Sequence, residues 1–239
     1  MSNHQVLTDA THRDLRILTE ASGELGDAVM ACLPVPTEFR RVQACFPIVF
    51  RRELESDDFA ALALFGFTNG ENLFLEGSQW TAPYKPLALA IQPFLVGRPA
   101  AGEGPGQVHI DMGHPRISHS GEGVRVFDED GNATPFLERI AEMLGELDLG
   151  YRQSADFYAA LRRYELLEPF RLEVPLVDGS KNSLIGFHVI NEDRLRALGA
   201  GELGDLHAAG HLLPIFMALA SLSHLNELVA RKNAKARLG

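Results

Sequence analysis

An Asn-Gly pair, Asn69-Gly70, stands between apolar runs and constrains the fold more than any other feature of this sequence. Both residues tolerate the positive φ angles of tight turns, so the pair predicts a hairpin of antiparallel strands. The run at residues 59–67 is apolar on both faces, as in an interior strand. We therefore expect residues 45–97 to form the core of a sheet: strands at 46–50 and 59–67, the latter central, a third meander strand at 72–76, and a return to the sheet at 94–96.

Periodicity and capping predict the other elements. Residues 107–112 alternate between apolar and polar side chains, and residues 124–127 form a short strand. Thr134 and Pro135 suit the start of a helix whose apolar stripe runs to Leu147. The remaining expected elements are a helix at 153–167, a hairpin with strands at 170–177 and 184–190, a short helix capped by Asn191, and a last helical region at 202–229 bent at Pro214.

These elements predict an α+β protein with a mostly antiparallel sheet, on which helices from the C-terminal half pack. We expect one domain over residues 1–239, with an N-terminal extension at 1–35, a sheet-rich half at 36–127, and a helix-rich half at 134–230 containing the hairpin at about 170–190. Turns are expected at 55–58 and 178–179, and a loop at 98–106. The apolar stretch at 212–225 is too short to span a bilayer, so we expect it to be a buried helix against the sheet.

Charge and motif content disfavour several classes of function. The formal net charge of −10 disfavours nucleic acid or an anionic membrane as partner, because both bind basic surfaces. No basic and apolar leader is visible, which predicts a cytoplasmic protein. Cys32 and Cys45 lack the spacing of a metal-binding pair, and we expect buried thiols. The motifs GxGxxG, Walker A, GxSxG and HExxH are absent.

The order of short motifs resembles the SapC family over nearly the whole chain. The most specific block is Gly70-Glu71-Asn72-Leu73-Phe74, followed by Trp80 and Tyr84. The chain departs from the family pattern at residues 90–92, where Ala-Ile-Gln stands in place of a basic and aromatic pair. The other matching positions are 11–16, 35–36, 38–39, 46–50, 66, 86, 93–94, 121–122, 126–128, 130–131, 166–169, 186, 190, 210 and 221–222.

The resemblance implies no catalytic residues. The family takes its name from a surface-layer locus, and members in Gram-negative bacteria tend to be encoded beside TonB-dependent receptors, cupin-like hydroxylases and flavin-dependent halogenases. This context implies a part in the uptake or modification of a substrate. Our leading hypothesis is a non-catalytic binding or accessory protein, without a cofactor, that is associated with such a halogenase or hydroxylase or with a TonB-dependent uptake locus. Its partner would be the halogenase or hydroxylase or a small-molecule ligand.

Two other hypotheses remain open. One is a metal-dependent enzyme that uses a cluster of histidine and aspartate residues. The other is a structural protein associated with a surface layer, which the missing leader and the acidic, mixed composition disfavour.

The first candidate site consists of Glu71, Asn72, Trp80 and Tyr84. Aromatic side chains on a proline-containing segment beside a turn can form a concave binding surface. The alternative is that Trp80 and Tyr84 simply cover one face of the sheet. We expect Trp80 to be chiefly structural and Tyr84 to affect binding.

The second candidate site consists of His109, Asp111, His114 and His119. Imidazoles and a carboxylate are common ligands of zinc and non-haem iron. The alternative is a polar surface hairpin that exposes its histidines, and we expect no stoichiometric metal. His207 and His211 are four residues apart on an expected helix, but the glutamate of HExxH is missing between them.

Overall fold

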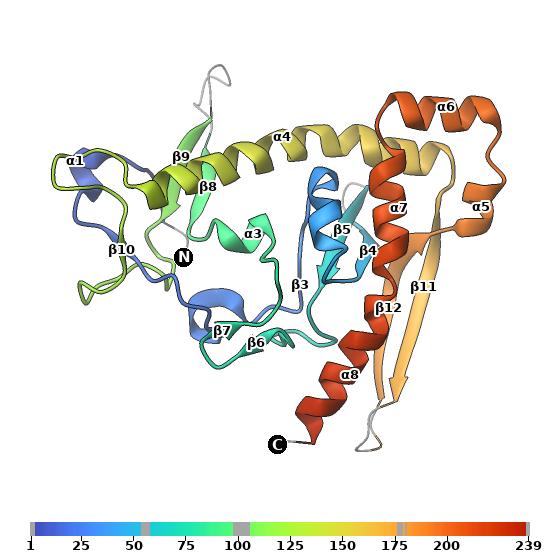
Figure 1. Ribbon diagram of the computed structural model, residues 1–239, viewed down its shortest axis with the longest axis horizontal. Coiled ribbons are helices and arrows are strands. Elements are labelled where there is room, and N and C mark those ends of the chain that lie inside the picture. The colour runs from blue at the N-terminus through green and yellow to red at the C-terminus, as the bar shows by residue number, and fades with distance from the viewer. Residues whose placement is uncertain (1–2, 54–57, 98–105, 176–178, 180, 238–239) are drawn as a thin grey trace. The chain divides into compact units, whose positions relative to one another are not determined.

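A computed structural model describes residues 3–53, 58–97, 106–175, 179 and 181–237 (Figure 1). Every strand pair in these residues is antiparallel, and the longer helices lie in the C-terminal half, so the predicted α+β class is confirmed. The chain divides into two compact units. The first comprises Met1–Ala28, Leu75–Thr81 and Leu87–Leu149, and the second comprises Val29–Phe74, Ala82–Pro86 and Gly150–Gly239. The expected single domain stays a prediction, and the expected turn residues 55–57 and 178 and loop residues 98–105 lie outside the described residues.

The first unit contains a three-stranded sheet of order β1-β9-β8 and two smaller sheets. Strand β9 (Gln107–Asp111) confirms the alternating strand predicted at 107–112, with Ile110 fully buried in the core of this unit. The other elements of this unit are β1 (His4–Val6), α1 (Asp9–His12), β2 (Arg16–Ile17), a π-helical turn at Gly23–Asp27, β6 (Leu75–Glu76), β7 (Gln79–Trp80), α3 (Leu87–Ala90), β8 (Phe94–Gly97), β10 (Val124–Arg125) and the first half of α4 (Pro135–Arg163).

A buried ion pair holds the N-terminal segment of the first unit. The Arg116 guanidinium donates to Asp27 Oδ2 at 2.6 Å, and both side chains are almost completely buried. The same guanidinium donates to the carbonyl oxygens of Leu18 and Glu20, each at 2.9 Å. These charge-assisted bonds compensate for the desolvation of both ions. Residues from the expected N-terminal extension are therefore part of the interior of this unit.

The second unit is built on a five-stranded sheet of order β11-β12-β4-β5-β3. Strands β4 (Ile48–Arg52) and β5 (Phe59–Leu64) confirm two predicted strands; β5 is interior, as expected, while β4 holds the middle position. The predicted hairpin is also confirmed: β11 (Leu167–Pro175) pairs with β12 (Lys181–Ile190), and β12 pairs with β4. The strand on the other side of β5 is β3 (Ala31–Cys32), from the expected N-terminal extension.

The predicted third meander strand at residues 72–76 is wrong. Glu71 Oε2 accepts a hydrogen bond from the Phe67 amide and Asn72 Oδ1 accepts one from the Phe74 amide, both at 2.9 Å. Together with one backbone bond, from the Leu73 amide to the Phe65 carbonyl at 2.8 Å, these local side-chain bonds close a compact loop in place of a longer hairpin ladder. Residues Leu75–Glu76 pair with β7 instead. The predicted return to the same sheet is also wrong, because β8 pairs with β9 in the first unit.

Helix α4 is one helix, where two were predicted. It begins as predicted after Thr134, whose Oγ1 accepts a hydrogen bond from the Leu137 amide at 3.4 Å. It then continues through Gly145 and Gly150 to Arg163. A glycine in a helix costs only about 1 kcal/mol, and buried side chains such as Ile140 and Phe157 anchor both halves. The helix therefore tolerates both glycines.

The last helical region is divided into α6 (Ala200–Ala208), α7 (Leu212–Ser221) and α8 (His224–Ala236), and the predicted bend at Pro214 is wrong. The chain turns at Gly210, whose φ is +74°. Pro214 lies in the first turn of α7, where a missing N–H breaks no helical hydrogen bond. The remaining helices of this unit are the 3-10 helix η2 (Pro36–Glu38), α2 (Phe39–Val42) and α5 (Glu192–Arg196), the last capped as predicted by Asn191.

Helix α7 packs against β12 and β4 of the five-stranded sheet (Figure 1). The Ser221 hydroxyl at its end accepts a hydrogen bond from the Ile48 amide at 2.8 Å, and Ile215 and Ala218 are buried. This confirms that a C-terminal helix covers the sheet. The helix is buried only on the side that meets the sheet, because Leu213 and Phe216 on its other side are exposed.

Candidate functional site

The structure divides the predicted aromatic site between the two units. Trp80 lies in β7 of the first unit opposite Leu75, whereas Glu71, Asn72 and Tyr84 belong to the second. Asn72 is buried in the loop described above, and Glu71 forms an ion pair with Lys232 of α8. The Tyr84 hydroxyl donates to Glu38 Oε1 at 2.6 Å. In the second unit these three side chains therefore make internal contacts.

The predicted metal-binding residues do not converge either. Asp111 Oδ1 accepts hydrogen bonds from the amides of Asn3 and Gly113. Both bonds lower the pKa of the Asp111 carboxyl, and the bond from Asn3 has the larger effect. His114 Nδ1 accepts from the Arg116 amide at 3.1 Å, and His119 is exposed. Within the described part of the chain, no group of three or more His, Cys, Asp or Glu side chains could hold a metal ion.

The other histidine pair is separated by the turn at Gly210. His207 lies in α6, whereas His211 precedes α7, so the two rings are not on one helical face. His211 instead packs edge-on against Phe157 of α4, with the ring centroids 5.6 Å apart.

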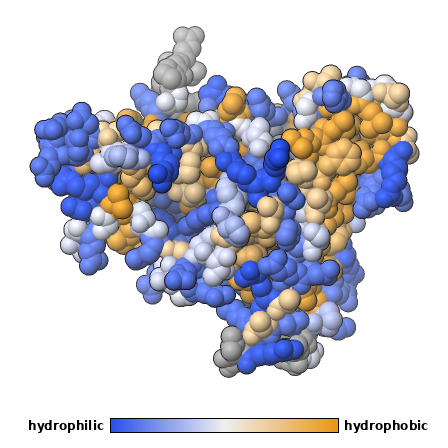
Figure 2. All heavy atoms as spheres, viewed as in Figure 1, coloured by the Kyte–Doolittle hydropathy of each residue, from blue (hydrophilic) through white to orange (hydrophobic). Residues whose placement is uncertain are grey.

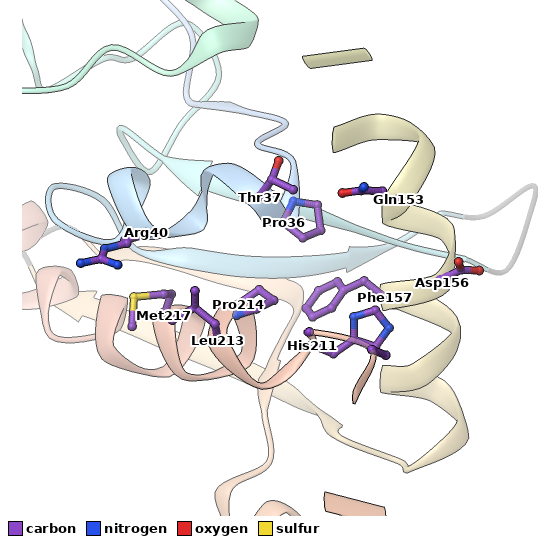
Figure 3. Close-up of a pocket in the computed structure, with 12 residues that line it drawn as sticks. Pro36, Thr37, Arg40, Gln153, Asp156, Phe157, His211, Leu213, Pro214 and Met217 are labelled. Atoms are coloured by element: carbon purple, nitrogen blue, oxygen red, sulfur yellow. The ribbon is translucent and has the colours of Figure 1, made fainter. Parts of the chain in front are cut away.

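His211 lines a groove of about 490 Å³ in the second unit, which we call the His211 groove (Figure 3). Three segments that are distant in sequence form it: η2 with α2, the second half of α4, and the α6–α7 turn with the start of α7. Its lining residues are Pro36, Thr37, Arg40, Gln153, Asp156, Phe157, Ala209, Gly210, His211, Leu213, Pro214 and Met217.

The His211 groove has an apolar middle and polar ends. Figure 3 shows Arg40 beside Met217 at one end and Asp156 with His211 at the other. Burial lowers the pKa of the His211 imidazole, and the nearby Asp156 carboxylate partly opposes that shift. The imidazole is therefore neutral at pH 7 and offers one hydrogen-bond donor and one acceptor. Such a groove suits an amphipathic ligand or the edge of a partner protein.

An apolar surface adjoins this groove on the outer face of α7. Leu213 is 53% exposed and Phe216 is 49% exposed, and they are three residues apart on one helical face. Figure 2 shows apolar side chains gathered over this part of the molecule. Large exposed apolar patches on soluble proteins usually mark contact sites. We call Leu213, Phe216 and the neighbouring Met217 the α7 face.

The same region contains one stretch, Leu212–Lys235, that is long and apolar enough to cross a membrane by length and composition. Only 28% of its most apolar window is buried. Core helices of soluble proteins share this length and composition, so the stretch does not by itself indicate a membrane span.

Sequence reasoning missed the His211 groove. In the sequence, His211 stands out only by its spacing from His207, and the proline-containing segment at 36–40 and the helix at 153–157 carry no motif. The available signal was Gly210 four residues before Pro214, a pattern typical of one helix ending and another beginning.

Comparison with known proteins places the chain in a family. The SapC family model matches residues 7–228, which is nearly the whole sequence. No curated protein and no solved structure matches the chain. The resemblance inferred from the motifs is thereby confirmed, and the chain belongs to the SapC family.

Proposed function

We propose that this protein is a non-catalytic accessory protein that binds a protein partner through the α7 face. The partner would be a modification enzyme, such as a flavin-dependent halogenase or a cupin-like hydroxylase, or a component of a TonB-dependent uptake system. The observation that carries the proposal is the exposure of Leu213 and Phe216 beside the His211 groove. Protein interfaces combine such apolar anchors with a polar rim, here Arg40 and Asp156.

The buried face of α7 supports this assignment. Pro214, Ile215, Ala218 and Ser221 already satisfy the packing of α7 on the sheet. Leu213 and Phe216 are therefore not needed for that packing, and their burial by a partner would remove apolar surface from water at roughly 25 cal/mol per Å².

The test is binding between the purified protein and a flavin-dependent halogenase or cupin-like hydroxylase of the native host, measured by calorimetry. We expect the double substitution Leu213→Ser, Phe216→Ser to weaken binding at least about 30-fold, the effect of losing an interface anchor of about 2 kcal/mol. The matched control is Ile185→Ser, which truncates a side chain that is 62% exposed on β12. It should leave the affinity unchanged.

Circular dichroism must show that both variants remain folded. Equal affinity in the wild-type protein and the double variant would overturn the α7 face as the binding surface. About one zinc or iron ion per chain, lost on His109→Ala, would instead favour the metal-dependent enzyme.

A further inference from the structure

One edge of β5 lacks a strand partner at four of its six residues, 59–62. Strand β3 pairs with β5 at Cys32↔Ala63 and Ala31↔Leu64, and beyond β5 the Phe65 amide donates to the Met30 carbonyl at 2.7 Å. Toward Phe59, among the described residues, the pairing goes no further. Continued in the same register, the chain would place Pro34 opposite Ala61 and Pro36 opposite Phe59. Proline has no N–H to donate to a ladder. The two prolines thus explain why β3 ends and why the edge at residues 59–62 stays open.

The open edge presents backbone groups away from β4. The Leu64 amide donates to the Pro47 carbonyl on the β4 side. Backbone groups of successive residues in a strand point to opposite sides, so those of the odd-numbered residues 59, 61 and 63 point away from β4. Ala61 is one of them, and its amide donates to the Tyr158 hydroxyl of α4 at 3.0 Å. The side chain of Tyr158 thus occupies the place of a strand carbonyl.

A groove of about 650 Å³ separates this edge from α4. Phe59, Ala60 and Ala61 form one wall, and the small side chains Ser154, Ala155 and Ala159 of α4 leave room along the other. Leu33 and Tyr151, which are 52% and 73% exposed, lie at its rim. We call this site the edge groove.

We propose that the edge groove binds an extended, basic peptide segment of a partner protein, which adds to β5 as a further strand. A strand edge is complementary to another extended backbone, and PDZ domains bind peptides by strand addition of this kind. In this arrangement a peptide carbonyl displaces the Tyr158 hydroxyl from the Ala61 amide, and alternate apolar side chains of the peptide enter between Leu33 and Tyr151.

The charges of the edge groove select the basic character of the peptide. Among the described residues, the lining contains the acidic side chains of Glu53, Asp58 and Asp156 and the cation Arg162, which pairs with Asp58 at 2.7 Å. The lining carries an excess of negative charge, so lysine or arginine side chains on the peptide are favoured. The edge groove shares Asp156 with the His211 groove, but Leu213, Phe216 and Met217 of the α7 face do not line it, and the proposal does not depend on the proposed function.

The probe is a fluorescent synthetic peptide in which valine alternates with lysine and threonine, and binding is followed by anisotropy. We expect this peptide to bind the wild-type protein saturably. The same peptide with alternate amides N-methylated should bind at least about tenfold more weakly, because strand addition needs those N–H donors. Tyr151→Ala should weaken binding. Tyr158→Phe should strengthen it roughly 2- to 10-fold, because the hydroxyl no longer competes for the Ala61 amide.

Two controls distinguish binding at the edge groove from binding elsewhere on the protein. Phe216→Ser on the α7 face should leave peptide affinity unchanged, so failure here is distinguishable from failure of the proposed function. The N-methylated peptide tests the wild-type protein and stays informative even if Tyr158→Phe does not fold. Equal binding of both peptides, or no binding at millimolar concentration, would overturn the proposal. The proposal would also be overturned if the Tyr158→Phe variant formed dimers in sedimentation and bound no peptide. That result would assign the edge of β5 to a second copy of the chain.

Discussion

Glu38 shows how a single buried residue depends on its neighbours. Its side chain is fully buried, and the Tyr84 hydroxyl donates to its Oε1 at 2.6 Å. Arg41 lies over the Tyr84 ring, with its Cζ 5.2 Å from the centroid. Burial of a carboxylate is costly unless hydrogen bonds compensate it. The structure therefore gives Tyr84 an internal role, as hydrogen-bond donor to a buried carboxylate.

Tyr84→Phe keeps the ring and removes the donor. We expect it to lower the free energy of unfolding by about 1–3 kcal/mol, because a buried acceptor loses a partner. The matched control is Tyr164→Phe, whose hydroxyl donates to the mostly exposed Asp205, and we expect a loss below about 1 kcal/mol. Urea unfolding followed by circular dichroism measures both. Equal losses would show that the burial of Glu38 is not what makes Tyr84 important.

The predicted effect of Tyr84 on binding can be read from the same variant. If folded Tyr84→Phe binds the partner as well as the wild-type protein does, the role of its hydroxyl is structural. Weaker binding at unchanged stability would support the surface predicted from the sequence.

At the scale of elements, α4 contains two glycines in different surroundings. A Cβ added at Gly145 would meet no atom within 4 Å. A Cβ added at Gly150 would lie 2.6 Å from both Thr37 Oγ1 and Val35 Cγ2. Gly145 therefore only lowers the helix propensity of α4. Gly150 allows η2 and the residue before it, Val35, to approach the helix closely.

Alanine substitutions at these glycines should have opposite effects. We expect Gly145→Ala to raise the free energy of unfolding by about 1 kcal/mol, because alanine favours the helix. Gly150→Ala should lower it by about 1–3 kcal/mol, because the added methyl group overpacks the contact. Thermal and urea unfolding of the pair give the comparison, each variant serving as the control for the other. A change of the same sign in both would contradict the close packing at Gly150.

Across the whole molecule, three histidines share one electrostatic property. Burial is the largest cause that lowers the pKa of His114, His188 and His211. Their folded-state pKa values thus lie below the unfolded value of about 6.5. As the pH falls below that value, the unfolded chain binds more protons than the folded chain, so the free energy of unfolding decreases until the pH passes the folded-state pKa values.

We therefore expect the urea midpoint to be lower at about pH 5.5 than at about pH 7.5. The double substitution His188→Gln, His211→Gln should reduce this difference, because it removes two of the groups responsible. His119→Gln changes an exposed histidine and serves as the control. A difference that persists in full in the double variant would assign the pH dependence to other groups.

Local signals in the sequence were sufficient for several elements. Alternation identified β9, apolar runs identified β4 and β5, and caps located the starts of α4 and α5. The α+β class followed from these elements, and the motif order identified the family. Each of these signals depends only on residues close together in the chain, which is why the sequence alone contains them.

Only the tertiary structure decided which segments meet. The Asn69-Gly70 turn was compatible with a hairpin, but side-chain bonds from Glu71 and Asn72 closed a loop, and β3 took the place beside β5. The His211 groove joins residues from positions 36 to 217, and the exposure of the α7 face depends on which of its sides packs on the sheet. Strand partners and burial result from contacts between residues distant in the chain, and their energies outweigh the small local preferences that a sequence displays.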